Sequence, residues 1–277
     1  MSVTVGQAVV LGVVQGLTEF LPVSSTAHLA IAQRFLPGFS QPGILFDVML
    51  HVGTLFAVAV YFRARIAGTL RGLASKDGAE KRAAWKLVGL LVLAVAMTGL
   101  VTMPLKKLAV EGMTDFRRIG FALLITAFVL AAAQAVGKAR GEAGRTLDEV
   151  RAGDAALVGL CQSASAVLHG LSRSGNTISV GLFSGMSRRA AAEFSFLLSI
   201  PTILAAAAVE NLHAFRHHED TFAVAGALPA YAAGMFVSAV VGYVAVALLF
   251  RLVVEMKLLP FAAYCAALGA VLVFTSA

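Results

Sequence analysis

The stretch EFLPVSSTAHLA, residues 19–30, lies between two apolar runs and interrupts them with a proline and a row of polar side chains. Pro22 ends a helix, and Ser24, Ser25 and Thr26 then stand where hydroxyl groups cap the first turn of the next helix. Polar groups at membrane depth are tolerated where protein cages them or where they face water. The stretch therefore predicts a helix–loop–helix segment that enters a membrane and turns back.

The composition supports a membrane protein built of helices. The chain has 277 residues, of which 59% are hydrophobic and 13% are charged, whereas soluble domains have about 45–50% apolar and 25% charged residues. The apolar runs are continuous and not alternating, which favours helices over a β-barrel. The net charge of +7 is explained by basic loops that fix orientation in a bilayer. We therefore expect an all-α polytopic membrane protein with no nucleic-acid partner.

Six apolar runs approach the roughly 20 residues that a spanning helix needs. They lie near 44–62, 87–105, 119–137, 190–208, 225–250 and 258–276. Two further stretches, near 5–36 and 155–186, are long enough to enter the membrane but are interrupted halfway, the first at Pro22 to His28 and the second at His169 to Thr177. The predicted fold is six transmembrane helices plus two re-entrant helix–loop–helix hairpins.

The basic residues predict the orientation of these segments. The loops 63–86 and 138–154 are rich in Lys and Arg, which places them in the cytoplasm. The loop 210–222 has one arginine among acids and histidines, which suits the outer side. The loop 106–118 contains four basic residues and argues weakly against its outer placement. Both termini are then expected outside.

The two halves of the chain resemble each other. FDVMLHVGTLFAVAV at 46–60 aligns with FSFLLSIPTILAAAA at 194–208, and the interrupted loops PVSSTAH and HGLSRSG fall at equivalent places. Because the aligned spans run in opposite directions, the repeat is inverted, as in transporters whose site lies where broken helices converge. We expect one membrane domain over 1–277, with repeat 1 at about 1–137, repeat 2 at about 155–277 and a cytoplasmic linker at about 138–154.

The first loop carries a carboxylate at membrane depth. Gln15 and Glu19 are four residues apart and share one face of a helix. An ionisable side chain in such a segment is by default functional. The alternative is structural: the serines are helix caps and Glu19 is a solvated helix end.

The second loop carries an arginine. Insertion scales give about 2.5–3.5 kcal/mol for Arg173 in a membrane segment, so it is expected to meet an anion, and its planar fork suits phosphate oxygens. Gly170 and Gly175 permit close backbone approach, and Ser174 to Thr177 can cap a helix whose amides point at the anion. A structural ion pair of Arg173 with Glu19 or Glu193 is the alternative, and it does not exclude a phosphate site.

The two loops together predict a phosphate site with a nucleophile. Ser25 or Ser24 attacks, a nearby base removes its proton, and Arg173 stabilises charge on the equatorial oxygens.

QGLTEFLPVSSTAH and GLSRSGNTISVGLFSGMSRRAAAEFSFLLSIP closely resemble the undecaprenyl-diphosphate phosphatase family (BacA, also called UppP). The resemblance extends over nearly the whole chain. It implies hydrolysis of the terminal phosphate of a C55 isoprenoid diphosphate, which recycles the lipid carrier of bacterial cell-wall synthesis and gives bacitracin resistance. It also implies a divalent cation, Mg²⁺ or Ca²⁺, and a site in the bacterial cytoplasmic (inner) membrane that opens to the outer, periplasmic face.

The resemblance implies roles for individual residues. The catalytic residues would be Glu19, Ser25, His28 as base or acid, and Arg173, with Glu19 also as metal ligand. Residues that share a substrate-binding role would be Gln15, Ser24, Thr26, Ser172, Ser174, Gly175 and Thr177. Gln15 replaces a glutamate that many members have, so two carboxylates cannot both bind a metal here. His169 stands where the family usually has proline.

Other features leave alternatives open. A transporter or flippase for a polyprenyl phosphate lipid would also use an inverted repeat, but it needs no nucleophile. Asp47 and His51 are four residues apart on a spanning helix and extend the polar network or form a structural pair. The oligomeric state is open, with a homodimer as one arrangement.

Overall fold

The computed structural model describes residues 3–39, 44–105, 115–140, 143–216, 228–255 and 257–276. Within these ranges the regular elements are helical, apart from one isolated β-bridge between Arg145 and Met186, so the predicted all-α class is confirmed. The helices are α1 (Val5–Thr18), α2 (Ser25–Phe35), α3 (Ile44–Tyr61), α4 (Arg63–Leu73), α5 (Gly78–Thr102), α7 (Phe116–Arg140), the 3₁₀ helix η1 (Leu147–Glu149), α8 (Ala152–Val167), α9 (Arg173–Phe183), α10 (Arg188–Arg216), α11 (Leu228–Val254) and α12 (Leu259–Thr275).

In the part of the chain that the structure describes, four helices are long and apolar enough to cross a membrane, namely α5, α7, α10 and α11. Helix α3 passes the same test together with α4, from which it is bent by 75°, and this pair raises the number of candidate spans in the described ranges to five. Helices α1 and α12 are apolar but shorter. The chain is therefore a multi-pass membrane protein.

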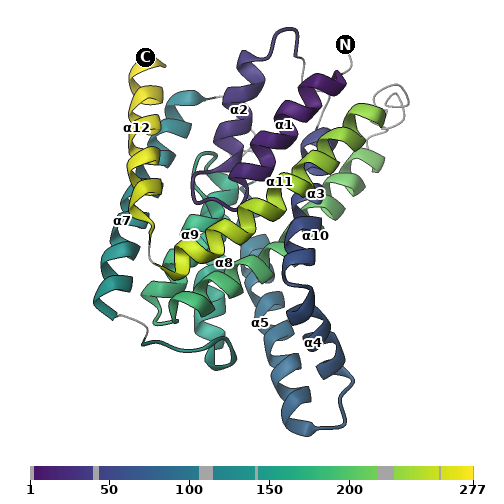
Figure 1. Ribbon diagram of the computed structural model, residues 1–277, viewed down its shortest axis with the longest axis vertical. Helices are drawn as coiled ribbons and strands as arrows, with labels where there is room; N and C mark the ends of the chain where they lie inside the picture. The colour runs from purple at the N-terminus through teal and green to yellow at the C-terminus, as the bar shows by residue number, and fades with distance from the viewer. Residues whose placement is uncertain are drawn as a thin grey trace.

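The basic segment 63–86 is a helical hairpin and not the loop that its charge predicted. It contains α4, a short turn and the first residues of α5. The Asp77 carboxylate caps α5 by accepting from the amides of Ala79 (2.7 Å) and Glu80 (3.4 Å). The turn projects at the end of the molecule opposite to the start of α1 and the end of α12 (Figure 1). Parts of the expected outer loops, 106–114 and 217–222, lie outside the described residues, and residues 210–216 of the second expected loop are instead the end of α10.

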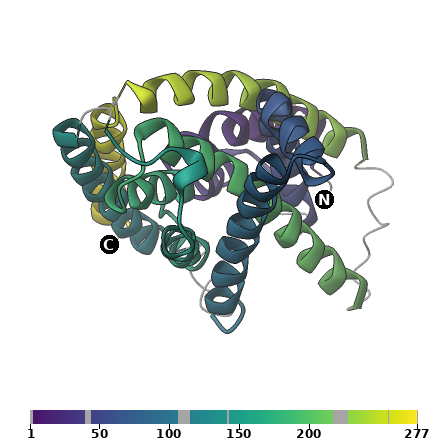
Figure 2. The same cartoon turned by 90° about the horizontal axis from the view of Figure 1, so that it is seen from below.

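Helices from the two halves of the chain pack against each other. Helix α11 lies along α1 and α3, α5 lies along α8, and α12 lies along α7 (Figures 1 and 2). Glycines allow the backbones to approach closely, as in other membrane helix pairs. A Cβ on Gly12 would lie 2.6 Å from the Gly234 carbonyl oxygen, and a Cβ on Gly159 would lie 2.3 Å from that of Ala94.

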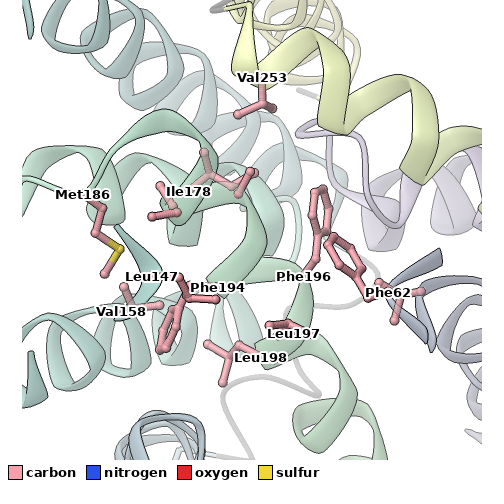
Figure 3. Packing of buried hydrophobic residues seen from close by; sticks show 14 of the residues in the cluster. Phe62, Leu147, Val158, Ile178, Met186, Phe194, Phe196, Leu197, Leu198 and Val253 are labelled. Carbon is pink, nitrogen blue, oxygen red and sulfur yellow. The ribbon is translucent and has the colours of Figure 1, made fainter. Parts of the chain in front are cut away.

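A cluster of aromatic rings forms the centre of the hydrophobic core. Figure 3 shows Phe196 beside Phe62 and among the aliphatic residues of α9 and α10. The Phe196 ring centroid lies 5.9 Å from those of Phe20 and Phe62 and 6.3 Å from that of Phe250. Phe20 follows Glu19 directly in the sequence, so the polar site described below adjoins this close-packed core.

Candidate active site

The two helix breaks meet in space. Ser174 Oγ donates to the Leu21 carbonyl (3.2 Å), and the Gly170 amide lies 3.5 Å from Thr26 Oγ1. A Cβ on Gly175 would lie 3.1 Å from Pro22 Cβ. The convergence that the sequence predicts between residues about 150 positions apart is therefore present in the structure.

The first break places a serine at the start of a helix. Helix α1 ends at Thr18, and Glu19 is its C-terminal cap. Ser24 has a φ of +70° and caps α2, since its Oγ accepts from the Ala27 amide at 3.4 Å. Ser25 is the first residue of α2, so its side chain is presented where the helix amides begin.

The second break places an arginine at the start of a helix. Gly170 turns the chain with a φ of +99°, which favours glycine. Ser172 caps α9 by accepting from the Gly175 amide (3.2 Å), and its own amide donates to Thr126 Oγ1 (3.0 Å). Arg173 is the first residue of α9.

Glu19 is the centre of the site. It is 6% exposed, and its Oε2 accepts hydrogen bonds from Ser25 Oγ (2.7 Å) and Gln15 Nε2 (3.0 Å). Its Oε1 accepts from Arg173 Nη2. Glu19 is thus a buried, paired carboxylate in direct contact with a hydroxyl group, and not a solvated helix end.

The structure decides between the two ion pairs that the sequence left open for Arg173. Arg173 pairs with Glu19. Glu193 instead pairs with Arg65, whose Nε lies 3.1 Å from Glu193 Oε1. One nitrogen of the planar Arg173 fork is thereby engaged by the carboxylate, in a group that has five N–H donors in all.

His51 adds a second basic group beside Glu19. Its Nε2 lies 3.5 Å from Glu19 Oε2, and its Nδ1 lies 2.8 Å from the Asp47 carbonyl oxygen. The Asp47 carboxylate itself accepts from Gln33 Nε2 (3.1 Å). The pattern of Asp47 and His51 therefore marks an extension of the polar network, in which His51 contacts the Asp47 backbone.

His28 lies at the edge of the site. Its Nδ1 is 2.7 Å from the Ser24 carbonyl oxygen, and its Nε2 is 2.7 Å from the hydroxyl of Tyr264 on α12. Sequence reasoning did not select Tyr264, because a tyrosine in an apolar helix far along the chain carries no motif. Its contact with His28 is visible only in the fold.

The remaining predicted residues surround this centre in different ways. Ser24 Oγ and Thr26 Oγ1 lie 3.1 Å apart, and Ser172 Oγ and Ser174 Oγ lie 3.3 Å apart. Thr177 Oγ1 donates to the Arg173 carbonyl (2.9 Å) and lies 2.6 Å from Ser195 Oγ, which ties it to its own helix and to α10.

The arrangement has the groups that phosphoryl transfer needs. A hydroxyl donates to a carboxylate that can take its proton, and an arginine and two helix N-termini supply positive potential for phosphate oxygens. These groups come from both halves of the chain, so neither hairpin alone completes the site.

Comparisons with known proteins place the chain in a family. The family model described as "Bacitracin resistance protein BacA" matches residues 8–271. A protein of Syntrophotalea carbinolica named undecaprenyl-diphosphatase is 40% identical over 265 residues, covering 95% of each chain. Proteins of the same name from Treponema denticola (40% over 268 residues; 95% of this chain, 94% of the relative) and Geobacter metallireducens (41% over 270 residues; 95% of each) are similarly related. The resemblance carried by the two loop motifs is confirmed, and the chain belongs to the BacA family of bacitracin resistance proteins.

Proposed function

We propose that the chain hydrolyses undecaprenyl diphosphate to undecaprenyl phosphate and inorganic phosphate. This reaction recycles the lipid carrier of cell-wall synthesis and accounts for bacitracin resistance. The proposal rests on the hydrogen bond that Ser25 Oγ donates to Glu19 Oε2. The other carboxylate oxygen of Glu19, Oε1, pairs with Arg173. The relatives named undecaprenyl-diphosphatase support the same activity.

In this reaction Ser25 Oγ attacks the terminal phosphorus while its proton passes to Glu19 Oε2, 2.7 Å away. The bond from that phosphorus to the bridging oxygen breaks, and undecaprenyl phosphate leaves. Water then hydrolyses the phosphoserine and restores Ser25. Arg173 and the amides at the start of α2 and α9 stabilise the charge on the phosphate oxygens. Direct attack by a water that Glu19 activates, with Ser25 binding phosphate, is the alternative route.

The site offers few protein ligands for a divalent cation. Gln15 is fully buried, and its Oε1 has no hydrogen-bond partner in the described part of the chain. Oxygen ligands suit Mg²⁺ and Ca²⁺, which bind through one or two protein groups together with substrate phosphates. No group of three His, Cys, Asp or Glu side chains that could hold a metal occurs among the described residues. Gln15 and Glu19 would therefore hold the cation with the diphosphate, and it would neutralise phosphate charge.

The six spanning helices and two re-entrant hairpins in an inverted repeat belong to the same proposal. The packing of the helices supports this proposal. Helix α1 of the first half packs on α11 of the second half, and α8 of the second half packs on α5 of the first half. Gly12 and Gly159 occupy equivalent places in α1 and α8, and each approaches a carbonyl of its partner helix closely. In this proposal the chain is one membrane domain, in which repeat 1 ends near 137 and repeat 2 begins near 155.

The proposed location rests on the family resemblance, and the charges support the proposed orientation. We place the protein in the bacterial inner membrane with the basic α4–α5 hairpin in the cytoplasm. The start of α1 and the end of α12, which lie at the opposite end of the molecule, then face the periplasm, and the headgroup enters from that side (Figure 1). A homodimer stays a prediction that light scattering of the protein in detergent tests.

Phosphate release from undecaprenyl diphosphate by the purified protein tests the function. We expect release that depends on Mg²⁺ or Ca²⁺ and that is lost in Arg173→Ala. The matched control is Arg251→Ala, which removes an exposed arginine paired with Glu255 (2.9 Å) and should leave turnover unchanged. Binding of the lipid without release by a folded wild type would instead favour the transporter.

A further inference from the structure

Both nitrogens of the His28 ring are engaged, and their partners define how the ring is held. The Ser24 carbonyl can only accept a hydrogen bond, so His28 Nδ1 donates to it. In the neutral imidazole, Nε2 is then an acceptor, and the Tyr264 hydroxyl donates to it. The two rings also stack, with centroids 5.6 Å apart and planes inclined by 16°.

The Ser24 backbone that His28 contacts is strained. Ser24 is the only residue other than glycine with a positive φ in the described ranges. Such a conformation is unfavourable for a residue that carries a side chain, and it persists only where its surroundings hold it. The Ser24 carbonyl accepts from both Nδ1 and the backbone amide of His28, at 2.7 and 3.3 Å.

The strained residue directly precedes the proposed nucleophile. Ser25 Oγ donates to Glu19 at 2.7 Å, and its direction depends on the turn at Ser24. Helix α12 contacts the same loop a second time, since the sulfur of the buried Cys265 lies 3.6 Å from the Pro22 carbonyl oxygen. A helix near the C-terminal end of the chain therefore supports the loop that carries the reacting hydroxyl.

We propose that Tyr264 is a positioning residue for the phosphatase reaction, an inference that rests on the proposed function. Its hydroxyl fixes the His28 ring, the ring fixes the Ser24 carbonyl, and the Ser24 turn directs Ser25 Oγ at Glu19. A contact that only fastened α12 to α2 would stabilise the fold without affecting the catalytic step.

The variant Tyr264→Phe separates these two roles, because it keeps the stacked ring and removes only the hydroxyl. We expect kcat to fall about tenfold, as small displacements of a reacting group do, while KM changes less than about twofold. The matched control is Tyr243→Phe. Tyr243 is 40% exposed against 46% for Tyr264, and its ring contacts Tyr61 with centroids 6.1 Å apart. Its kcat and KM should equal those of the wild type.

A second readout observes His28 itself. In the full chain labelled with ¹⁵N-histidine, His28 should show a protonated Nδ1 and a hydrogen-bonded Nε2. In Tyr264→Phe the Nε2 resonance should move to the position of a nitrogen without a hydrogen bond, and His28→Gln assigns the signal.

The outcomes are distinct. Wild-type kcat in a folded Tyr264→Phe, or an Nε2 signal that is the same in both proteins, overturns the positioning role. Failure of the proposed function appears differently, as absence of phosphate release from the wild type.

Discussion

The two helix breaks that meet at the site, before α2 and before α9, are built differently. The second break turns at Gly170, which adopts a positive φ without strain. The first turns at Ser24, where a side chain makes the same sign of φ costly. The relaxed loop supplies the fixed charge of Arg173, and the strained loop supplies the hydroxyl of Ser25. In the proposed mechanism, the strained backbone therefore precedes the hydroxyl that reacts, and the unstrained turn precedes the long side chain that binds phosphate.

The largest effect is expected where the two breaks join. Glu19→Gln removes the proton acceptor of Ser25 and leaves the Arg173 charge without its partner, so turnover should fall by about 10³-fold or more. Phosphate release in detergent measures it, with thermal unfolding as the check on folding. Glu255→Gln, which alters an exposed carboxylate paired with Lys257 (2.6 Å), is the control. More than a tenth of wild-type turnover in Glu19→Gln would exclude Glu19 as the base.

The second largest effect is expected from replacing the serines of the two breaks, and the losses in kcat should differ between them. Ser25→Ala removes the hydroxyl that contacts Glu19, and we expect a loss of about 10²- to 10³-fold in kcat. Ser174→Ala removes a hydroxyl that donates to the Leu21 carbonyl, so a loss below about tenfold is expected. Steady-state kinetics of the two variants, measured under the same conditions, give the two losses in kcat. Equal losses would show that the first break has no special role.

The glycine of the second break should be essential for stability. A Cβ on Gly170 would lie 2.5 Å from the Ile119 carbonyl oxygen, in addition to the strain at a φ of +99°. Gly170→Ala should therefore lower the free energy of unfolding by about 2–3 kcal/mol or more. In Gly89→Ala nothing lies within 4 Å of the new Cβ, and its stability should equal or exceed that of the wild type. Denaturation in detergent compares the two, and equal stabilities would contradict the close approach.

The smallest effect concerns the strain at Ser24. Ser24→Gly relieves the positive φ but removes the cap on Ala27, so stability should change by less than about 1 kcal/mol. Ser24→Ala removes the cap and keeps the strain, which should cost about 1–2 kcal/mol. The difference between the two unfolding free energies measures the strain at Ser24, reduced by the extra unfolded-state entropy of glycine. A more stable alanine variant would mean that Ser24 is unstrained.

Much of the fold follows from local pattern. The apolar run 119–137 lies within α7, and the run 225–250 lies largely within α11. Both predicted breaks occur, the first at Pro22 and the second at Gly170, whose φ is +99°. The α4 helix was missed because its basic composition resembled a loop. In the candidate site, the ion pair of Glu19 with Arg173 could be predicted from the sequence, because an unpaired charged side chain within a membrane is unfavourable in free energy.

The contacts that the sequence could not reveal are those between helices with no shared motif. His51 reaches Glu19 from α3, and Tyr264 reaches His28 from α12 across 236 positions of sequence. No regular spacing in the sequence links either side chain to the residue that it contacts. The sign of φ at Ser24 is likewise set by the surrounding contacts and not by the residue type.

The aromatic rings beside the site have a consequence for the membrane as an electrical barrier. A polar pocket within a bilayer thins the insulating layer, and each elementary charge that crosses it dissipates about 2.3 kcal/mol per 100 mV of membrane potential. Phe20 and Phe196 are 0% and 1% exposed, and their rings pack with those of Phe62 and Phe250 next to Glu19. Close-packed rings leave no room for a file of water, along which protons would travel. We therefore expect these packed rings to form an apolar layer beside the polar site that hinders the passage of water and ions through the protein.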